Sequence, residues 1–444
     1  MNKVVCSLFL LTIILLCNPL DSKASVIYEV RQGDSLWKIA KVYDIPLQTV
    51  IELNQLDKEE TLVPGQVLLI PGQRYIVRQN ESLYEIASNH SLSITQLMKH
   101  NQLDSSLIMP AQTLQIPKRY KRPIMTGAFF VPSYQTDKAE RIIEQYENQL
   151  SNIAFFEFHP DASGNLSKLP GTENIPYAWK KRMYPYATVT NLTAKGFDPS
   201  LAHRVMTNPA ARNNLVNQIF WQLKAHDLEG IVIDFEGLDP KDRKAYNLFI
   251  KALASKLHPS GMKVALAVPP LQGDYYPGYH AAYDYKTLGK HADYIFLMTY
   301  DWHWAGGPSG PIAPINKVEQ TVKYATQSIP KHKIILGIPM YAYDWTLTGP
   351  NKKATAYSQQ KALEKARYYQ SEIHYDSETA QPYFRYTDNN GFVHEVWFED
   401  ARSFLAKAEL LREYQLAGIG GWKLGLQFNS ASNLLLEEFI IRKP

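Results

Sequence analysis

The sequence predicts an α/β protein: a (β/α)8 barrel with a small α+β insertion between strands 7 and 8, preceded by two small βααβ modules. Two observations predict this fold. An opening segment repeats once at a spacing of 47 residues, and the residues from 123 to 444 alternate short apolar runs with helical stretches. That second stretch is long enough for one closed barrel with an insertion. A chain of 444 residues suits about three domains in all.

The composition is that of a folded protein with ordinary cores, because 45% of the residues are hydrophobic and 20% are charged. The 47 basic and 43 acidic residues give a net charge of +4 without a long basic run. A face that binds nucleic acid would concentrate basic residues, so we expect no nucleic-acid partner. Aromatic residues reach 12%, and their flat rings suit core packing as well as the faces of sugars.

Residues 1–24 are predicted to be a signal peptide. A lysine precedes the apolar run of residues 4–16, and small residues allow cleavage near Ala24. The run is short for a membrane span, which needs about 20 apolar residues; an uncleaved anchor is the alternative. Both cysteines, Cys6 and Cys17, lie in this segment. We therefore expect a secreted protein that has no cysteine and no membrane contact in its mature form.

The repeat comprises residues 26–72 and 73–118. Each copy has a strand of alternating polarity, two short amphipathic helices and a closing apolar strand. In the first copy, Asp34 or Ser35 is placed to cap the first helix. The motif YxVxxGDSLxxIA, followed by NxL and PGQxLxIP, resembles the LysM module in both copies.

The resemblance to LysM implies binding to chains that contain N-acetylglucosamine, in bacterial peptidoglycan or in chitin. The glycan groove of that family lies between the loop after the first strand and the loop before the last strand. Carried over to this chain, the groove residues are Gly33, Asp34, Ser35, Leu62 and Val63 in the first copy, and Asn80, Glu81, Ser82, Ile108 and Met109 in the second. For each of them, building a turn or a helix cap is the alternative role.

After a short basic linker, the residues from 123 to 444 contain eight short apolar runs with the pattern of parallel strands buried on both faces. The runs are 124–130, 152–158, 186–190, 230–235, 263–268, 294–299, 333–339 and 418–422. Between the last two runs, residues of about 347–400 include an Asp388-Asn389-Asn390-Gly391 turn between short polar and aromatic runs. This pattern predicts an antiparallel insertion.

The strongest candidate for catalysis is the run of residues 229–236, EGIVIDFE. Residues two apart share one face of a strand, so Val232, Asp234 and Glu236 are expected to point into the barrel, at the end where such barrels hold their active sites. Two carboxylates on one buried face repel each other and lose solvation, so one should keep a proton at neutral pH. An acid beside a carboxylate is what glycosidic cleavage requires. A salt-bridging or helix-capping pair is the alternative.

This run resembles the DGxDxDxE signature of glycoside hydrolase family 18. Three further motifs of that family follow in chain order: Met298-Thr299-Tyr300-Asp301, Gly337-Ile338-Pro339-Met340-Tyr341 and Gly420-Gly421-Trp422. The sequence departs from the signature at two positions. Glu229 replaces the first Asp, and Val232 replaces the middle Asp, which serves as the charge partner of the next Asp in the family's mechanism.

The resemblance implies a retaining mechanism assisted by the substrate, an exception to the usual scheme with two carboxylates. Glu236 would protonate the glycosidic oxygen, Asp234 would orient the acetamido group of the substrate, and Tyr300 would hydrogen-bond the acetamido oxygen. The substrate-binding residues would be Asp301, Trp422, Met298 and Tyr341. Further candidate platforms for sugar rings are Trp302, Trp304 and Trp345, with packing at the rim as the alternative.

The leader, the LysM pair and the barrel together resemble bacterial N-acetylglucosaminidases that lyse the cell wall or the spore cortex. They predict a monomeric enzyme at the cell wall or spore envelope, with peptidoglycan or a chitin-like N-acetylglucosamine polymer as its partner. We expect no cofactor and no metal, since the sequence has no HExxH motif and no histidines at metal-binding spacing. A secreted chitinase and a lectin impaired by Val232 are the alternatives.

Overall fold

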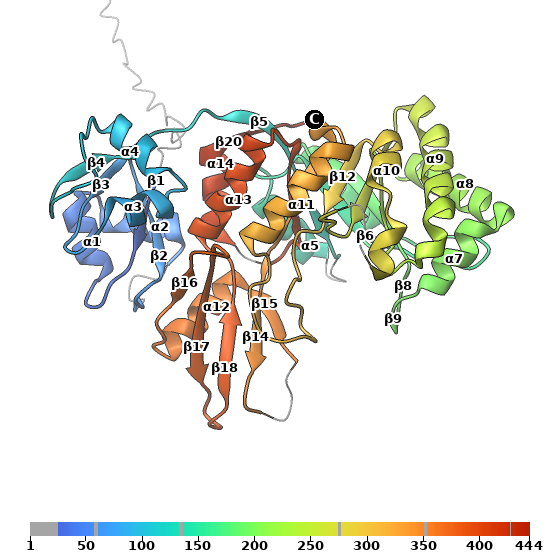
Figure 1. The fold of residues 1–444 in the computed structure, drawn as a ribbon. Helices are drawn as coiled ribbons and strands as arrows, with labels where there is room; N and C mark the ends of the chain where they lie inside the picture. Colours follow the sequence, from blue (N-terminus) through green and yellow to red (C-terminus); the bar gives the residue numbers. More distant parts are fainter. Residues whose placement is uncertain (1–24, 57–60, 133–135, 274–276, 350–352, 427) are drawn as a thin grey trace, which may run out of the picture.

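A computed structural model describes residues 25–56, 61–132, 136–273, 277–349, 353–426 and 428–444. Its largest part is a closed barrel of eight parallel strands surrounded by helices, as the sequence predicts (Figure 1). The barrel closes because β19 pairs with both β13 and β5. The barrel strands are β5 (Arg122–Phe130), β6 (Asn152–Phe158), β7 (Tyr184–Thr190), β10 (Gly230–Asp234), β11 (Lys263–Val268), β12 (Tyr294–Leu297), β13 (Ile334–Pro339) and β19 (Gly418–Trp422).

Helices between these strands cover the outside of the barrel. They are α5 (Thr136–Gln145), α6 (Ile175–Lys180), α7 (Pro199–Thr207), α8 (Pro209–Ala225), α9 (Arg243–Leu257), α10 (Tyr285–His291), α11 (Ile315–Ser328), α13 (Ala401–Glu413) and α14 (Asn429–Glu438). A last strand, β20 (Phe439–Ile441), pairs with the beginning of β5. A short hairpin, β8 (Leu192–Thr193) and β9 (Gly196–Phe197), follows β7.

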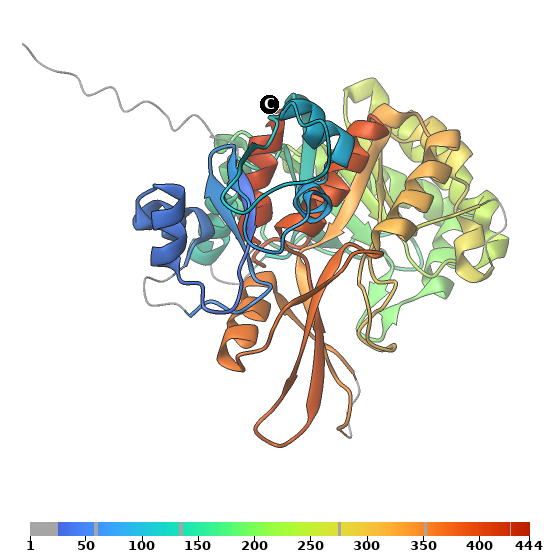
Figure 2. The ribbon, with the colours of Figure 1, turned by 60° about the vertical axis from the view of Figure 1, so that its left-hand side comes forward.

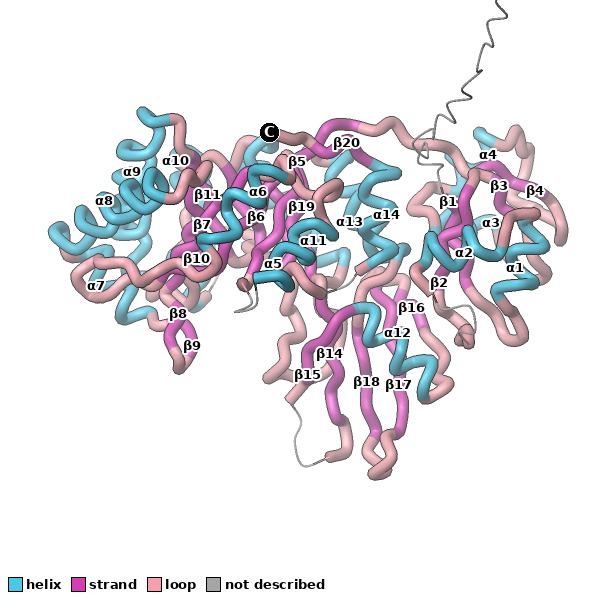
Figure 3. The backbone as a smooth tube through the Cα atoms, turned by 180° about the vertical axis from the view of Figure 1, so that it is seen from behind, coloured by secondary structure: helices cyan, strands magenta, loops and turns pink. Residues whose placement is uncertain are grey.

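Between β13 and β19 the chain forms a five-stranded antiparallel sheet, which projects from one end of the barrel (Figure 3). The elements of this insertion are β14 (Tyr341–Thr346), β15 (Thr355–Ser358), α12 (Gln359–Tyr368), β16 (His374–Asp376), β17 (Gln381–Thr387) and β18 (Val393–Trp397). The sheet begins at Tyr341, before the expected start near 347. Only Met340 separates β13 from β14, and no Gly or Asn marks the change of direction in the sequence.

The two amino-terminal modules have the expected order of strand, helix, helix and strand. Module 1 contains β1 (Ser25–Glu29), α1 (Leu36–Tyr43), α2 (Leu47–Asn54) and β2 (Val67–Pro71), and module 2 contains β3 (Arg74–Ile76), α3 (Leu83–Asn89), α4 (Ile94–His100) and β4 (Thr113–Gln115). Ser35 caps α1, and Ser82 forms a capping box with Glu85 at α3. Module 1 contacts α13 through β2 and α14 through α2, and its Pro64 carbonyl accepts a hydrogen bond from Ile373 of the insertion (Figure 2).

Two apolar cores hold the barrel in shape. Val232 and the other inward-facing side chains fill the interior, whereas Ile231, Ile233 and Phe235 pack outward between the strands and the helices. This alternation along β10 is the one that the sequence predicts. Each fully buried large apolar side chain contributes about 1.5–3 kcal/mol. Within the described residues, no helix combines the length and the apolar character needed to cross a membrane.

Candidate active site

A cleft of about 510 Å³ opens at the carboxyl ends of the barrel strands. Six of the predicted site residues line it: Asp234, Glu236, Met298, Tyr300, Asp301 and Trp422. They come from three different parts of the chain, which the closed barrel brings together. The β8–β9 hairpin adds Leu192 and Phe197 to the wall, and the segment after β11 adds Pro269 and Pro270.

The backbone around Glu236 is held on both sides. The side-chain amide of Asn191, which is fully buried, accepts a hydrogen bond from the Glu236 N–H (2.8 Å) and donates one to the Glu236 carbonyl (2.9 Å). The hydroxyl of Tyr283 donates to the carbonyl of Phe235 (2.6 Å). These three bonds fix the peptide groups on which the Glu236 side chain depends, so the carboxyl group approaches the cleft from a defined position.

The two carboxyl groups of β10 favour their protonated forms. Burial raises the pKa of Asp234 well above its ordinary value, and the neighbouring charges of Glu236 and Glu157 raise it further. Burial, followed by the charge of Asp301, raises the pKa of Glu236 to about 7. Oδ1 of Asp234 is buried and has no hydrogen-bond partner among the described residues. The expectation that this pair keeps a proton at neutral pH therefore agrees with the electrostatics of the site.

A third carboxylate, Glu157, lies two strands away from Asp234 on β6. Thr190, on the strand between them, donates its hydroxyl hydrogen to Glu157 (2.6 Å) and pairs in register with Asp234. Val232 carries no charge at the middle position of the signature. Glu157 is thus the acid on a neighbouring strand whose charge acts on Asp234. We did not identify it from the sequence, where the only signal is one acid inside the apolar run AFFEF.

The segment after β12 supplies a hydroxyl and a carboxylate. Burial raises the pKa of Tyr300 well above its ordinary value, so its hydroxyl remains a hydrogen-bond donor. Asp301 has a left-handed backbone (φ 62°) and accepts a hydrogen bond from the hydroxyl of Tyr341. Tyr341 is only 4% exposed and is not part of the cleft wall. In this structure its hydroxyl positions Asp301.

Trp422 lies at the end of β19, against two phenylalanine rings of the barrel. Its ring centroid is 4.9 Å from that of Phe156 and 5.4 Å from that of Phe129. This packing fixes an aromatic surface at the bottom of the cleft, the kind of surface that suits the face of a sugar. Among the other candidate platforms, Trp302 lines the cleft, and Trp304 is 58% exposed and does not line it. Trp345 is 1% exposed and belongs to the core of the insertion.

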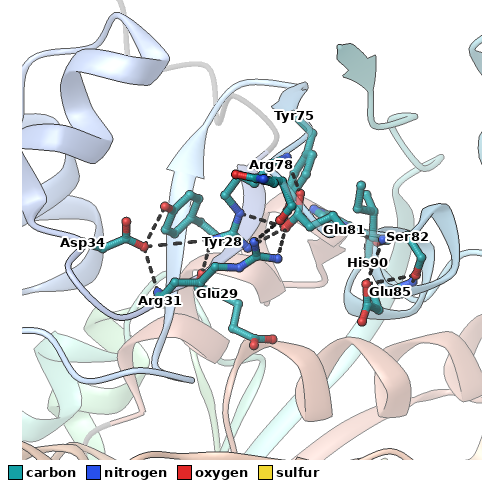
Figure 4. A network of polar contacts seen from close by, with 12 residues as sticks. Tyr28, Glu29, Arg31, Asp34, Tyr75, Arg78, Glu81, Ser82, Glu85 and His90 are labelled. Atoms are coloured by element: carbon teal, nitrogen blue, oxygen red, sulfur yellow. Dashed lines mark hydrogen bonds and ion pairs between the residues drawn. The ribbon is translucent and has the colours of Figure 1, made fainter. Parts of the chain in front are cut away.

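Two of the predicted glycan contacts in the modules are structural residues (Figure 4). Asp34 accepts hydrogen bonds from the hydroxyl of Tyr28 and the N–H of Arg31, both at 2.8 Å. Glu81 accepts the corresponding bonds from Tyr75 and Arg78, both at 2.7 Å. Matching pairs of hydrogen bonds to a carboxylate therefore fix the first loop of each module. Ser35 and Ser82 cap the helices that follow.

The remaining predicted contacts differ between the modules. Gly33, Asn80 and Met109 are exposed, and Leu62 and Ile108 are partly buried against the core of the modules. Val63 is fully buried in a cluster formed with the insertion. In this structure the insertion covers the Val63 side chain.

Comparisons with known proteins agree with this geometry. The chain matches the family model described as "Glycosyl hydrolases family 18" over residues 195–427, and the LysM domain model over residues 28–71 and 75–117. It is 37% identical to the cortical fragment-lytic enzyme of Bacillus anthracis over 429 residues, which cover 94% of this chain and 99% of that protein.

Solved structures are similar over most of the chain. The spore cortex-lytic enzyme SleL of Bacillus cereus superposes with a TM-score of 0.88 at 33% identity, covering 95% of this chain and 99% of that chain. A chitinase from Chromobacterium violaceum gives a TM-score of 0.66 at 26% identity, covering 71% of this chain and 98% of that chain. The protein thus belongs to glycoside hydrolase family 18, with two LysM domains ahead of its catalytic barrel.

Proposed function

We propose that this glycosidase is exported and hydrolyses the β-1,4 bonds that follow N-acetylglucosamine in the peptidoglycan of the spore cortex or cell wall. The names of its relatives support this substrate, since a cortical fragment-lytic enzyme and a spore cortex-lytic enzyme match it over nearly their whole length. The LysM pair supports a polymeric substrate rich in N-acetylglucosamine. The predicted signal peptide, which supports export, lies outside the described residues.

The observation that carries this proposal is the pair of acids at the carboxyl end of β10, which line a cleft together with aromatic side chains. With a pKa of about 7, Glu236 holds a proton at neutral pH and can give it to the glycosidic oxygen. The acetamido oxygen of the substrate then attacks the anomeric carbon, which gives an oxazolinium ion and overall retention. Asp234 stabilises the positive charge on the acetamido nitrogen, and the Tyr300 hydroxyl holds the acetamido oxygen. The Glu236 carboxylate finally takes a proton from the attacking water.

A chitinase is the second candidate function. It is favoured by the structural likeness to the Chromobacterium violaceum chitinase, which extends over 98% of that chain. Chitin and peptidoglycan share N-acetylglucosamine, so the same catalytic residues serve both reactions. A lectin without activity is disfavoured, because both acids of β10 are present in the cleft.

A digest separates these functions. Purified cortex sacculi, cell-wall sacculi and chitin oligomers are each incubated with the protein, and the reducing ends of the products are identified by mass spectrometry. We expect fragments that end in reducing N-acetylglucosamine from the sacculi. Products from chitin alone would assign a chitinase, and no product from any polymer would assign a lectin.

The role of Glu236 is tested by replacing it with glutamine, which cannot give up a proton as an acid. Glu236→Gln should lower kcat by about a hundredfold to ten-thousandfold. Binding to sacculi should stay unchanged. The matched control is Glu229→Gln, at the amino end of the same strand and away from the cleft. Activity that survives in Glu236→Gln but not in Glu229→Gln would contradict the assignment.

A further inference from the structure

The two modules expose their second loops to very different extents. Val63 in module 1 and Met109 in module 2 occupy equivalent positions in the repeat, immediately before a proline. Val63 is 0% exposed and Met109 is 69% exposed. Two residues further on, Gly65 is buried whereas its counterpart Ala111 is exposed. The loop that forms one wall of the LysM groove is therefore covered in module 1 and open in module 2.

The catalytic part of the chain provides the cover over module 1. The N–H of Ile373 donates to the carbonyl of Pro64 (2.9 Å). Arg402, on α13, is 2% exposed and donates to the carbonyl of Gly65 (3.3 Å) and to the carboxylate of Glu29 (2.8 Å). Removing one partner of such a buried pair would leave the other charge buried without compensation. The loop is thus part of a fixed interface with the insertion and the barrel.

The sheet of module 1 also packs against the barrel. One face of the β1–β2 sheet packs against the helices of the module. On the other face, Ile27 and Leu69 are part of the core of the barrel. The side-chain amide of Asn433 on α14 donates to the carbonyl of Leu53 (2.7 Å), and the hydroxyl of Ser25 donates to the carboxylate of Glu437 (2.7 Å). Both faces of this small sheet are therefore used for packing.

Module 2 is held in place by module 1 (Figure 4), and also by Arg119 of the linker, which donates to the carbonyl of Ser91 (3.2 Å) and pairs with Glu409 on α13 (2.7 Å). Arg31 donates to the carbonyl of Gln79 (2.7 Å), and Arg78 reaches back to the carbonyl of Glu29 (2.6 Å). The guanidinium group of Arg78 also lies 4.5 Å from the ring centroid of Tyr28. One apolar core runs through both modules. These reciprocal contacts give module 2 a defined orientation relative to the catalytic barrel.

From these contacts we infer that the two LysM modules have different tasks: module 1 is a docking element, and module 2 presents the surface that binds the N-acetylglucosamine polymer. The binding surface consists of the exposed residues Asn80, Ser82 and Met109 of its two loops, with the partly buried Ile108 between them and the core. Their amide, hydroxyl and apolar groups match the acetamido groups and ring faces of the polymer. This inference rests on the proposed binding of such a polymer. The inference adds that module 2 alone is enough to bind the polymer.

Matched variants of the full-length protein test the division. Gly33→Asp in module 1 and Asn80→Asp in module 2 place the same side chain at equivalent exposed positions, and both positions have a positive φ that Asp tolerates. Met109→Glu is added to Asn80→Asp to place a charge on the second wall of the groove. Binding to insoluble sacculi and to chitin is measured by depletion from solution. The Asn80→Asp/Met109→Glu variant should bind at least about tenfold more weakly, equal to about 1.4 kcal/mol, and Gly33→Asp should match the wild type.

Hydrogen exchange gives an independent readout. A soluble N-acetylglucosamine oligomer should slow exchange in residues 78–82 and 108–112, and leave residues 31–35 unchanged. Equal losses of binding in the two modules, or protection of residues 31–35, would overturn the division and leave the proposed function standing. If the wild type binds no polymer, the proposed binding fails, and the inference fails with it. Turnover of a short soluble oligomer, measured in every variant, shows that the barrel is intact.

Discussion

Four carboxylates determine how the active site responds to pH. Asp234 ends β10 and Glu236 follows two residues later, Glu157 acts on Asp234 from β6, and the charge of Asp301 raises the pKa of Glu236. The reactive form of the β10 pair carries one proton, on Glu236, and the pair titrates as a unit. Glu157 supplies a negative charge that Val232, in the signature itself, cannot supply. Because that charge opposes the ionisation of Asp234, removing it should make Asp234 easier to deprotonate.

Glu157→Gln should therefore move the acid limb of the kcat/KM profile to lower pH. The sign follows from the charge, since a neutral amide no longer raises the pKa of Asp234. The profile is measured on a soluble N-acetylglucosamine oligomer, with Glu229→Gln as the control that should leave it unchanged. An acid limb that stays in place or moves to higher pH would show that Glu157 does not act on the pair.

The residues that the sequence identified in the site are those that a local pattern marks. Asp234 and Glu236 follow from the alternation of one strand, and Tyr300 and Trp422 from motifs at the ends of two others. Glu157 and Asn191 act through hydrogen bonds to residues on other strands, 33 and 45 positions away. No local pattern marks such partners, so they become visible only when the barrel closes.

Among the elements, the insertion is organised around one buried acid. Asp344 on β14 accepts hydrogen bonds from Tyr357 on β15 (3.0 Å), Lys365 on α12 (2.7 Å), Tyr386 on β17 (2.7 Å) and His394 on β18 (2.8 Å). Burial alone would raise the pKa of Asp344, but these donors outweigh it and the pKa lies below the ordinary value. Asp344 thus stabilises the insertion while it is ionised. That stabilisation is present at neutral pH and is lost as the pH falls through the lowered pKa.

Replacing Asp344 should loosen this part of the chain. Asp344→Ala leaves a partly buried lysine and two tyrosine hydroxyls without their acceptor, at a cost of about 1–3 kcal/mol. Thermal unfolding should show the loss at pH 7, and the difference from wild type should shrink in acid. Glu378→Gln, an exposed acid of the same insertion, is the control and should be neutral. A variant as stable as the wild type would mean that the hydrogen bonds do not hold the insertion together.

The strands themselves were predictable, because their apolar runs are bounded by polar or turn-forming residues. The start of the insertion was not, since β13 and β14 form one continuous apolar stretch around Met340. The Met340 N–H still bonds to the carbonyl of Trp422 on β19 (2.9 Å), whereas from Tyr341 onward the chain pairs with β15 and β18 of the insertion. A boundary set by tertiary pairing leaves no mark in the local pattern.

For the molecule as a whole, the sequence predicts the parts and not how they pack. The repeat and the barrel follow from periodicity, whereas the contact between Glu29 and Arg402 joins residues 373 positions apart. Nothing local to Val63 or Gly65 indicates that the insertion covers them. The one local sign of this packing is that the docked loop of module 1 has Gly65 where module 2 has the larger Ala111.

Gly65→Ala should weaken the docking of the modules on the barrel. A Cβ atom at Gly65 would lie 1.7 Å from the carbonyl oxygen of Ile373, and the backbone there has a φ of 78°. The left-handed backbone alone costs about 1–2 kcal/mol for Ala, and the clash forces the loop away from Ile373. We expect a lower free energy of unfolding and faster hydrogen exchange at the Ile373 N–H, which donates to Pro64.

The control is the reverse change in module 2, Ala111→Gly, which relieves a φ of 67° at an exposed position and should be neutral or stabilising. Unchanged exchange at Ile373 in Gly65→Ala would show that the modules stay docked without this loop, and that the sheet of module 1 holds them alone.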